Sequence, residues 1–430
     1  MTIKNIYKLY LQHPRVITDS RKIVPGCIFI ALKGENFNGN KFAEDAINKG
    51  AVCAIIDEEE FTVPNRTILV EDTLQTLQKL AHLHRKTLGL PILGITGSNG
   101  KTTTKELLAA VLSQKFNLSF TKGNLNNHIG VPLTLLEMNS NTEFGIVEMG
   151  ANHPGDIADL CKITDPDYGI ITNIGKAHLK GFGSFEGVKK TKGELYDYLK
   201  KKKGTVFFNK DNSILTELSL KIENKVSYGE TDADFTGEVL NSPPFVHLKA
   251  NFPRGVLYLN TNLTGSYNFE NILAAACIGN FFKVDPLKIQ HALKEYQPSN
   301  QRSQLINKGD VKIIMDAYNA NPTSMKASIK SFLNGFSNTD TYLILGDMLE
   351  LGEYSQSEHA AVLQEIRNHP VKNVFLTGAE FRKVAKALPF KTFENVESLC
   401  TYLHNHPVLE GAVLIKGSRG IQLEKTLDCF

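Results

Sequence analysis

The 430-residue sequence lacks a strong charge imbalance, a long apolar run and any low-complexity tract. Its 48 lysines and arginines nearly balance 45 acidic residues, and the net charge of +3 gives no electrostatic reason to expect nucleic acid as a partner. No segment approaches the roughly 20 apolar residues that span a bilayer. The first residues, MTIKN, also lack the apolar stretch of a signal peptide. We therefore expect a cytoplasmic protein without an integral membrane segment.

Cysteine is scarce, with six residues in the whole chain. They lie in separate segments and none forms a C-x-x-C pair; they are Cys27, Cys53, Cys161, Cys277, Cys400 and Cys429. This distribution argues against a zinc site and against a disulfide framework, and it favours a reducing compartment.

Length and composition indicate a multidomain α/β protein. A chain of 430 residues is too long for one core, and its content of 42% hydrophobic and 22% charged residues is ordinary for globular proteins. Strand and helix patterns alternate along the chain. We predict a small α/β domain (residues 1–88), a central doubly wound domain with a mostly parallel sheet (89–298) and a C-terminal Rossmann-like α/β domain (299–430).

Short apolar runs mark the expected strands. In the first domain they cover residues 15–18, 27–32, 54–56 and 67–70, with helices at 41–49 and 73–88. In the second they cover 144–150, 168–173 and 204–209, and in the third 311–316, 341–347, 374–378 and 413–417. Apolar runs that end in polar residues are typical of buried parallel strands, whose carboxyl ends carry functional groups.

A glycine-rich stretch, TGSNGKTT at residues 96–103, follows an apolar run and precedes a helical run. Strand, glycine turn and helix together present backbone N–H groups and a helix N-terminus to a phosphate. Gly97 and Gly100 allow the backbone to curl, Lys101 can reach β- and γ-phosphates, and Thr102 offers a hydroxyl to Mg²⁺. The commonest pattern would place a glycine at Ile95. The alternative is a tight glycine turn before an ordinary helix.

Three further residues have two possible interpretations each. Glu148 ends the first strand after the loop, where it is either a Mg²⁺ ligand or a solvated carboxylate. His178 follows another strand end and is either structural or a ligand. Lys192 lies on the apolar stripe of a helix at residues 185–203. It either extends its amine to solvent or is carbamylated and becomes a carboxylate-like metal ligand.

The motifs TGSNGKTT (96–103), EMG (148–150), TNIGKAH (172–178) and KGE (192–194) resemble those of the Mur ligases, ATP-dependent amide-forming enzymes of peptidoglycan precursor synthesis. Four more stretches resemble the branch of that family that joins D-alanyl-D-alanine to UDP-N-acetylmuramoyl-tripeptide. They are GNLNNHIGVP (123–132), DAYNANPTSM (316–325), LGDMLELG (345–352) and KGSRG (416–420). The resemblance spans all three units.

The resemblance implies a role for each matching residue. ATP would be bound by Gly97, Ser98, Asn99, Gly100, Lys101, Thr102, Thr103, Asn268, Asn271, Arg302, Asp316, Asn319 and Asn321. The nucleotide-sugar peptide would be bound by Asp19, Ser20, Arg21, Asn124, Asn126 and Asn127. Two Mg²⁺ sites are implied, one at Thr102 and Glu148, the other at His178 and carbamylated Lys192. Lys101, Glu148, His178 and Lys192 would be the catalytic residues.

The implied reaction passes through an acyl phosphate and yields UDP-N-acetylmuramoyl-pentapeptide, ADP and phosphate, in the service of cell wall biogenesis, cell shape and cell division. A monomer is expected.

Three departures from the family's usual residues occur, at Asn38-Gly39-Asn40, Tyr267 and Gln301. The alternatives are a Mur-family ligase that adds a single amino acid, a nucleotide-hydrolysing regulator and a non-catalytic binding protein. The third residue of the peptide, L-lysine or meso-diaminopimelate, is left open.

Overall fold

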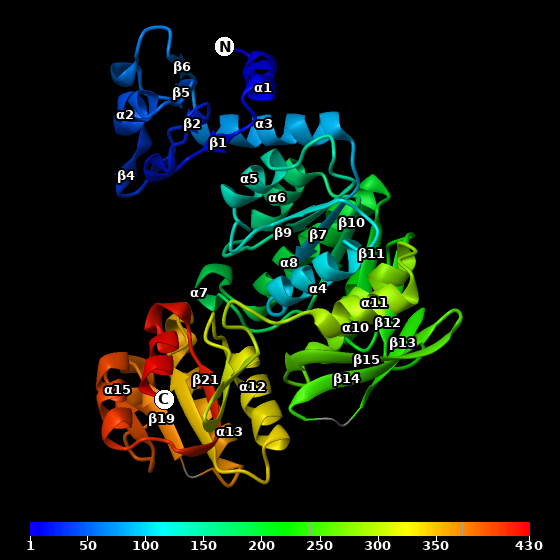
Figure 1. The fold of residues 1–430 in the computed structure, drawn as a ribbon, viewed down its shortest axis with the longest axis vertical. Helices are drawn as coiled ribbons and strands as arrows, with labels where there is room; N and C mark the ends of the chain where they lie inside the picture. The colour runs from blue at the N-terminus through cyan, green and yellow to red at the C-terminus, as the bar shows by residue number, and fades with distance from the viewer. Residues whose placement is uncertain (241–242, 372) are drawn as a thin grey trace.

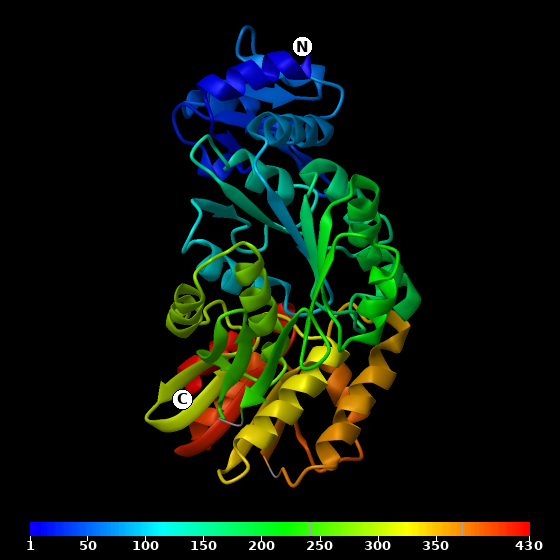
Figure 2. The same ribbon diagram turned by 90° about the vertical axis from the view of Figure 1, so that its right-hand side faces the viewer.

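The computed structural model describes residues 1–240, 243–371 and 373–430, and these form three α/β units. The two views show the units stacked along the long axis, with the N-terminal unit at one end and the C-terminal unit at the other (Figures 1 and 2). Each unit has its own sheet, which confirms the predicted class and three-unit organisation. No helix in these described ranges is both long and apolar enough to cross a membrane.

The N-terminal unit contains a parallel sheet in the order β1-β2-β5-β6. Its strands are β1 (Val16–Ile17), β2 (Ile28–Ile30), β5 (Cys53–Ile56) and β6 (Thr67–Leu69), with the small hairpin β3 (Lys33–Gly34) and β4 (Phe37–Asn38). The helices are α1 (Ile3–Gln12), α2 (Ala43–Asn48) and α3 (Thr73–Leu88), with 3₁₀ turns η1 (Ser20–Lys22), η2 (Gly39–Phe42) and η3 (Glu59–Phe61). Helix α1 was not predicted, whereas α3 has the predicted bounds.

Helix α3 joins the first unit to the second (Figure 1). Asp72 caps its N-terminus by accepting from the backbone N–H of Gln75, and Gly89 ends it in the left-handed conformation. One face of α3 packs on α1 and the other on helices of the central unit. Tyr10 Oη donates to the Leu136 carbonyl at 2.7 Å, and the His84 ring lies 2.8 Å from the Met138 carbonyl. These buried contacts couple the first two units.

The central unit is built on a sheet in the order β15-β14-β13-β12-β11-β10-β7-β9-β8. Its strands are β7 (Ile92–Thr96), β8 (Leu118–Phe120), β9 (Phe144–Glu148), β10 (Tyr168–Ile171), β11 (Thr205–Asn209), β12 (Lys225–Gly229), β13 (Phe235–Leu240), β14 (Phe245–Phe252) and β15 (Gly255–Thr264). Strands β7 to β13 run parallel, in agreement with the predicted mostly parallel sheet. Strands β8, β12 and β13 and the antiparallel ribbon of β14 and β15 were not predicted.

Helices cover both faces of the parallel part of the central sheet, and its strands β7 and β9 are buried along their whole length. They are α4 (Lys101–Leu112), α5 (Gly130–Leu136), α6 (Asp156–Thr164), α7 (Leu179–Phe182), α8 (Phe185–Lys202), α9 (Ser213–Ser219), α10 (Asn268–Phe281) and α11 (Pro286–Glu295). Helices α4, α10 and α11 pack on one face, and α5, α6 and α8 on the other. Strand order reverses around β7, and ligands of doubly wound sheets bind at such a reversal.

The C-terminal unit has a sheet in the order β16-β17-β21-β18-β19-β20. Its strands are β16 (Gln304–Lys308), β17 (Asp310–Met315), β18 (Thr341–Gly346), β19 (Asn373–Thr377), β20 (Lys391–Phe393) and β21 (Glu410–Lys416). The helices are α12 (Pro322–Gly335), α13 (Ser355–Arg367), α14 (Ala379–Val384) and α15 (Val396–Asn405), with 3₁₀ segments η4 (Gly352–Tyr354), η5 (Arg419–Ile421) and η6 (Leu423–Cys429). The four predicted strands are present; antiparallel β16 and the edge strand β20 were not predicted.

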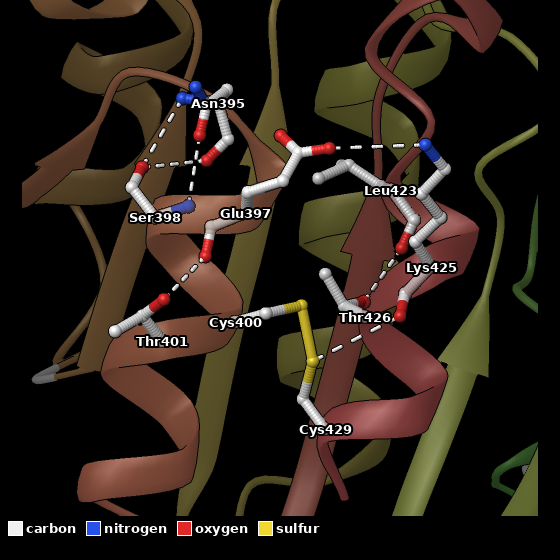
Figure 3. Close-up of a disulfide and its surroundings, with 9 residues drawn as sticks. All are labelled: Asn395, Glu397, Ser398, Cys400, Thr401, Leu423, Lys425, Thr426 and Cys429. Atoms are coloured by element: carbon white, nitrogen blue, oxygen red, sulfur yellow. Dashed lines mark hydrogen bonds and ion pairs between the residues drawn. A yellow bond between two sulfur atoms is a disulfide. The ribbon is translucent and has the colours of Figure 1, made fainter.

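A disulfide links two helical segments of the C-terminal unit (Figure 3). Cys400 on α15 is bonded to Cys429 on η6, at a sequence separation of 29 and with 5.7 Å between their Cα atoms. The argument from cysteine spacing against disulfides is therefore wrong for this pair. The two residues meet because η6 folds back and packs on α15, a contact that no local spacing reveals. The other four cysteines are free and buried, in agreement with the absence of a larger framework.

Candidate functional site

A cavity of about 1640 Å³ opens at the carboxyl ends of the central strands and reaches the C-terminal unit. It brings together most of the predicted site residues from both units. Those that line it are Ser98, Asn99, Gly100, Lys101, Thr102, Thr103, Asn124, Asn126, Asn127, Glu148, His178, Asn268, Asn271, Arg302, Asp316, Asn319 and Asn321. The fold therefore gathers residues that are up to 223 positions apart (98 to 321) around one hollow.

The loop between β7 and α4 requires glycine at two positions. Gly97 has φ +144°, and a Cβ there would lie 2.0 Å from the Thr172 hydroxyl. Gly100, at the N-terminus of α4, has φ +77°, and a Cβ there would lie 2.6 Å from Asn271 Oδ1. Both glycines thus meet a backbone requirement and a close approach at once. The predicted phosphate-loop geometry, with a twelve-residue helix behind it, is present.

The end of β10 holds this loop in place through several hydrogen bonds. The Asn99 backbone N–H donates to Asn173 Oδ1 at 3.0 Å, and the Thr172 hydroxyl donates to the Asn99 carbonyl at 2.6 Å. Ser98 Oγ accepts from the Gly175 backbone N–H at 2.9 Å. The TNIGKAH stretch therefore supports the loop, a role that the sequence did not indicate for Thr172 and Asn173.

Lys101 folds back over its own loop. Its Nζ donates to the Gly97 carbonyl at 2.7 Å and to the Ser98 carbonyl at 3.3 Å. Burial lowers the pKa of Lys101 to about 8, with Arg302 acting in the same direction and Glu148 opposing it. An anionic ligand in the loop would favour the charged amine and attract it away from these carbonyls.

Glu148, at the end of β9, is buried and has two differently occupied oxygens. Oε1 accepts from the Thr102 hydroxyl at 3.2 Å and from the Asn126 amide at 2.8 Å. Oε2 has no hydrogen-bond partner among the residues that the structure describes. A buried carboxylate oxygen without a donor, next to a threonine hydroxyl, is suited to a divalent cation. Thr102 and Glu148, the two residues of the predicted first metal site, therefore lie in direct contact.

His178 and Lys192 both lie close to the ring of Phe182. Lys192 Nζ is 5.4 Å from the centre of the Phe182 ring, and the His178 ring centre is 6.3 Å from it. His178 Nδ1 pairs with the Glu350 carboxylate of the C-terminal unit. The hydrogen bond from His178 lowers the pKa of Glu350. Lys192 itself does not line the cavity.

Lys192 is 1% exposed, so the inward-facing position predicted from helical periodicity is confirmed. Burial lowers the pKa of its amine well below the usual value, and the charge of Lys101 adds to this effect. Asp156 and Glu194 act in the opposite direction. Across the described ranges, no three His, Cys, Asp or Glu side chains converge to form a metal site.

The amide cluster on α10 forms part of the cavity wall. Asn271 Oδ1 accepts from the Thr104 hydroxyl at 3.0 Å, and its amide donates to Asn268 Oδ1 at 2.8 Å. Asn268 in turn donates to the Thr264 carbonyl at 2.7 Å. Both asparagines are thereby fixed against the phosphate loop and the start of α4.

The C-terminal unit contributes cations and a direct link to the phosphate loop. The Arg302 guanidinium stacks on the Tyr318 ring at 3.8 Å. The Asp316 carboxylate accepts from Lys416 Nζ at 2.6 Å, and Lys416 is 2% exposed. Asn321 Nδ2 donates to Asn99 Oδ1 at 2.7 Å. Sequence reasoning did not select Tyr318 and Lys416 as site residues. Tyr318 lies in the DAYNANPTSM stretch and Lys416 in the KGSRG stretch.

The predicted residues of the first unit do not reach this cavity. Asp19 begins η1 and accepts from Arg21 Nε at 2.9 Å and from Nη2 at 2.9 Å. This pairing lowers the pKa of Asp19 to about 2. The Arg21 side chain is 86% exposed, and Ser20 is buried. Asp19 and Arg21 therefore form an ion pair on the surface of the N-terminal unit, separate from this cavity.

Comparison with known proteins gives a consistent result along the whole chain. Family models match at residues 15–85 (Mur ligase family, catalytic domain), 95–279 (Mur ligase middle domain) and 301–419 (Mur ligase, glutamate ligase domain). The UDP-N-acetylmuramoyl-tripeptide–D-alanyl-D-alanine ligase of Bacillus subtilis (strain 168) is 34% identical over 453 residues, covering 99% of this chain and 97% of that protein. The chain belongs to the Mur ligase family.

Further relatives of this Mur ligase support the same branch. The ligase of the same name from Escherichia coli (strain K12) is 32% identical, with 96% of this chain and 92% of that protein covered. A crystal structure of MurF from Acinetobacter baumannii superposes with a TM-score of 0.88 at 30% identity, covering 96% of this chain and 92% of that chain. MurF from Thermotoga maritima, crystallised in complex with ADP, gives a TM-score of 0.87 at 28% identity, covering 98% and 97%.

Proposed function

We propose that this Mur ligase joins D-alanyl-D-alanine to the terminal carboxylate of UDP-N-acetylmuramoyl-tripeptide at the expense of ATP, as a monomeric cytoplasmic enzyme of peptidoglycan precursor synthesis. The observation that carries the proposal is the cavity in which a phosphate loop, a buried carboxylate and two C-terminal cations face one another. Its relatives over nearly the full length have names that specify this reaction.

We assign the three domains to three tasks. Residues 1–88 would bind the UDP end of the sugar peptide through Asp19, Ser20 and Arg21, and residues 89–298 would bind ATP. Residues 299–430 would complete the nucleotide site with Arg302, Asp316, Asn319 and Asn321. Asn268 and Asn271 would lie near the adenine, while Asn124, Asn126 and Asn127 would face the peptide. The guanidinium of Arg21 is exposed and would contact a diphosphate through the N–H groups that do not donate to Asp19.

The side chains present are suited to Mg²⁺. Thr102 and Glu148 would hold one ion, because the second oxygen of Glu148 has no hydrogen-bond donor among the described residues. His178 and Lys192 would hold a second ion if Lys192 is carbamylated. The depressed pKa of Lys192 supports this modification, since only a neutral amine reacts with carbon dioxide. Bound magnesium would offset negative charge on the phosphates during transfer.

The chemistry follows from the poor reactivity of a carboxylate. A carboxylate oxygen of the peptide attacks the γ-phosphorus of ATP, the bond to the β-phosphate oxygen breaks, and ADP leaves. The neutral amine of D-alanyl-D-alanine then attacks the acyl carbon, and the tetrahedral intermediate expels phosphate and loses a proton to give the amide. Lys101 would leave the loop carbonyls to contact the transferring phosphoryl group.

The test is phosphate release from ATP with and without each substrate. We expect release to require both the UDP-sugar tripeptide and D-alanyl-D-alanine, and the lysine and diaminopimelate peptides should differ in rate. Release that is indifferent to the dipeptide would refute the proposed branch. Activity with a single amino acid in place of the dipeptide would indicate another Mur ligase.

A further inference from the structure

Lys105, on the second turn of α4, is a buried lysine that none of the assigned roles uses. Its side chain is 0% exposed, and that of neighbouring Glu148 is 2% exposed. It lies four residues after Lys101, on the same face of α4 and one turn further along the helix. Lys101 points to the loop, whereas Lys105 points to the side of Glu148 that Thr102 does not occupy.

Two buried charged atoms face each other at this position without a hydrogen bond. Lys105 Nζ lies 3.7 Å from Glu148 Oε2, and neither atom has a hydrogen-bond partner among the residues described. Lys105 Nζ also lies 3.1 Å from Glu106 Oε1 and 5.9 Å from the centre of the Phe120 ring. A donor and an acceptor that are both unsatisfied and lie this close belong to one electrostatic unit.

The burial of Lys105 needs a compensating charge. Transfer of an ammonium group into a protein interior costs several kcal/mol unless an anion stabilises it. Glu106 has a side chain that is 26% exposed, so solvent weakens its attraction for the amine. Glu148 lies slightly further away but is 2% exposed, so solvent screens its attraction for the Lys105 amine much less.

We propose that Lys105 is a positioning residue that acts as the resident counter-cation of Glu148. In the absence of a metal ion, Lys105 attracts Oε2 of Glu148. Oε1 then stays within hydrogen-bond distance of Thr102 and Asn126. A divalent cation at Glu148 must share the carboxylate with this fixed positive charge. The ion therefore binds weakly alone and strongly when nucleotide phosphates add negative charge. The effect on divalent-cation binding rests on the proposed function, whereas the pairing of Lys105 with Glu148 does not.

The first test is a double-mutant cycle on the metal-free protein, measured by chemical unfolding. Lys105→Met removes the charge at similar length, Glu148→Gln removes its partner, and Lys105→Arg keeps the charge as a control. We expect K105M to lower the unfolding midpoint clearly, to lower it less in the E148Q background, and K105R to have the smallest effect. Additive effects of K105M and E148Q would overturn the pairing.

The second test measures how much Mg²⁺ is needed for ADP binding, by calorimetry of ADP at graded Mg²⁺ concentrations. K105M should lower the half-saturating Mg²⁺ concentration by about threefold or more, because one competing charge is gone. Glu106→Gln removes the second carboxylate near Lys105, so that Glu148 is the remaining anion beside the amine. This variant should raise the half-saturating Mg²⁺ concentration. E106Q also provides a test should K105M fail to fold.

The outcomes separate this inference from the proposed function. Equal Mg²⁺ requirements in the wild type, K105M and E106Q would overturn the effect on the metal. ADP binding that ignores Mg²⁺ in the wild type would instead contradict the metal site of the proposed function, and with it the effect on divalent-cation binding. The mutant cycle would then still decide whether Lys105 is paired with Glu148.

Discussion

Substitution of Gly100 by alanine should damage both the nucleotide site and the stability of the fold. Gly100 has φ +77° at the start of α4, where an L-residue is strained. The added Cβ would lie 2.6 Å from Asn271 Oδ1 and 3.2 Å from its Cγ. Asn271 cannot move away freely, because it accepts from Thr104 and donates to Asn268.

The loss in the free energy of unfolding that we expect for Gly100→Ala has two parts. Left-handed backbone costs alanine roughly 1–2 kcal/mol relative to glycine. Displacement of Asn271 would break or stretch two buried hydrogen bonds, each worth about 1 kcal/mol. We therefore expect Gly100→Ala to lower the free energy of unfolding by about 2–4 kcal/mol. Gly89→Ala is a matched control, since Gly89 has φ +64° and no atom within 4 Å of the new Cβ; it should cost only the backbone part.

Both variants are compared by urea unfolding and by calorimetric titration of ADP with Mg²⁺. G89A should bind ADP like the wild type, whereas G100A should lose at least about tenfold in affinity, equivalent to 1.4 kcal/mol. Similar unfolding energies for the two variants, with full ADP affinity in G100A, would refute the reasoning, because the collision with Asn271 would then have no consequence.

Three further predictions follow from other parts of the molecule. Reduction of the Cys400–Cys429 bond, or the double serine variant, should destabilise the C-terminal unit by about 3–4 kcal/mol, given a separation of 29 residues; an unchanged melting temperature under reductant would contradict this. Lys192→Ala should abolish nearly all phosphate release, and formate should restore part of it; an active variant would exclude Lys192 from the mechanism. Burial by itself raises the pKa of Asp165. Hydrogen bonds to its carboxylate, led by that from Lys202, outweigh this effect and lower the pKa to about 2, below the ordinary 3.8. The resulting stability, roughly 2 kcal/mol, is present above pH 3.8 and lost as the pH falls towards 2, so Asp165→Asn should flatten acid unfolding in that window.

Local patterns were sufficient for several parts of the fold. Helix α3 has its predicted bounds of Thr73–Leu88 because its start signal, Asp72, and its stop signal, Gly89, each act within one turn of the helix end. The phosphate loop was also predicted, since a strand, two glycines and a helix are neighbours in sequence. Inward-facing Lys192 followed from helical periodicity and was confirmed by its burial.

Other parts escaped prediction for a physical reason. The antiparallel ribbon of β14 and β15 depends on pairing at a sheet edge, and its alternating burial resembles that of an exposed hairpin. The disulfide depends on η6 folding back on α15. The argument against a disulfide framework missed this bond because separation along the chain says little about separation in a packed domain.

The sequence by itself determined the three-unit α/β organisation, the phosphate loop and the family, because these depend on periodicity and on motifs of fewer than about a dozen residues. Only the tertiary structure decided which side chains meet. It placed Asn321 on Asn99, Lys416 on Asp316 and Lys105 behind Glu148. Such contacts result from the packing of sheets and helices distant in sequence, and the charge balance of the site depends on that packing.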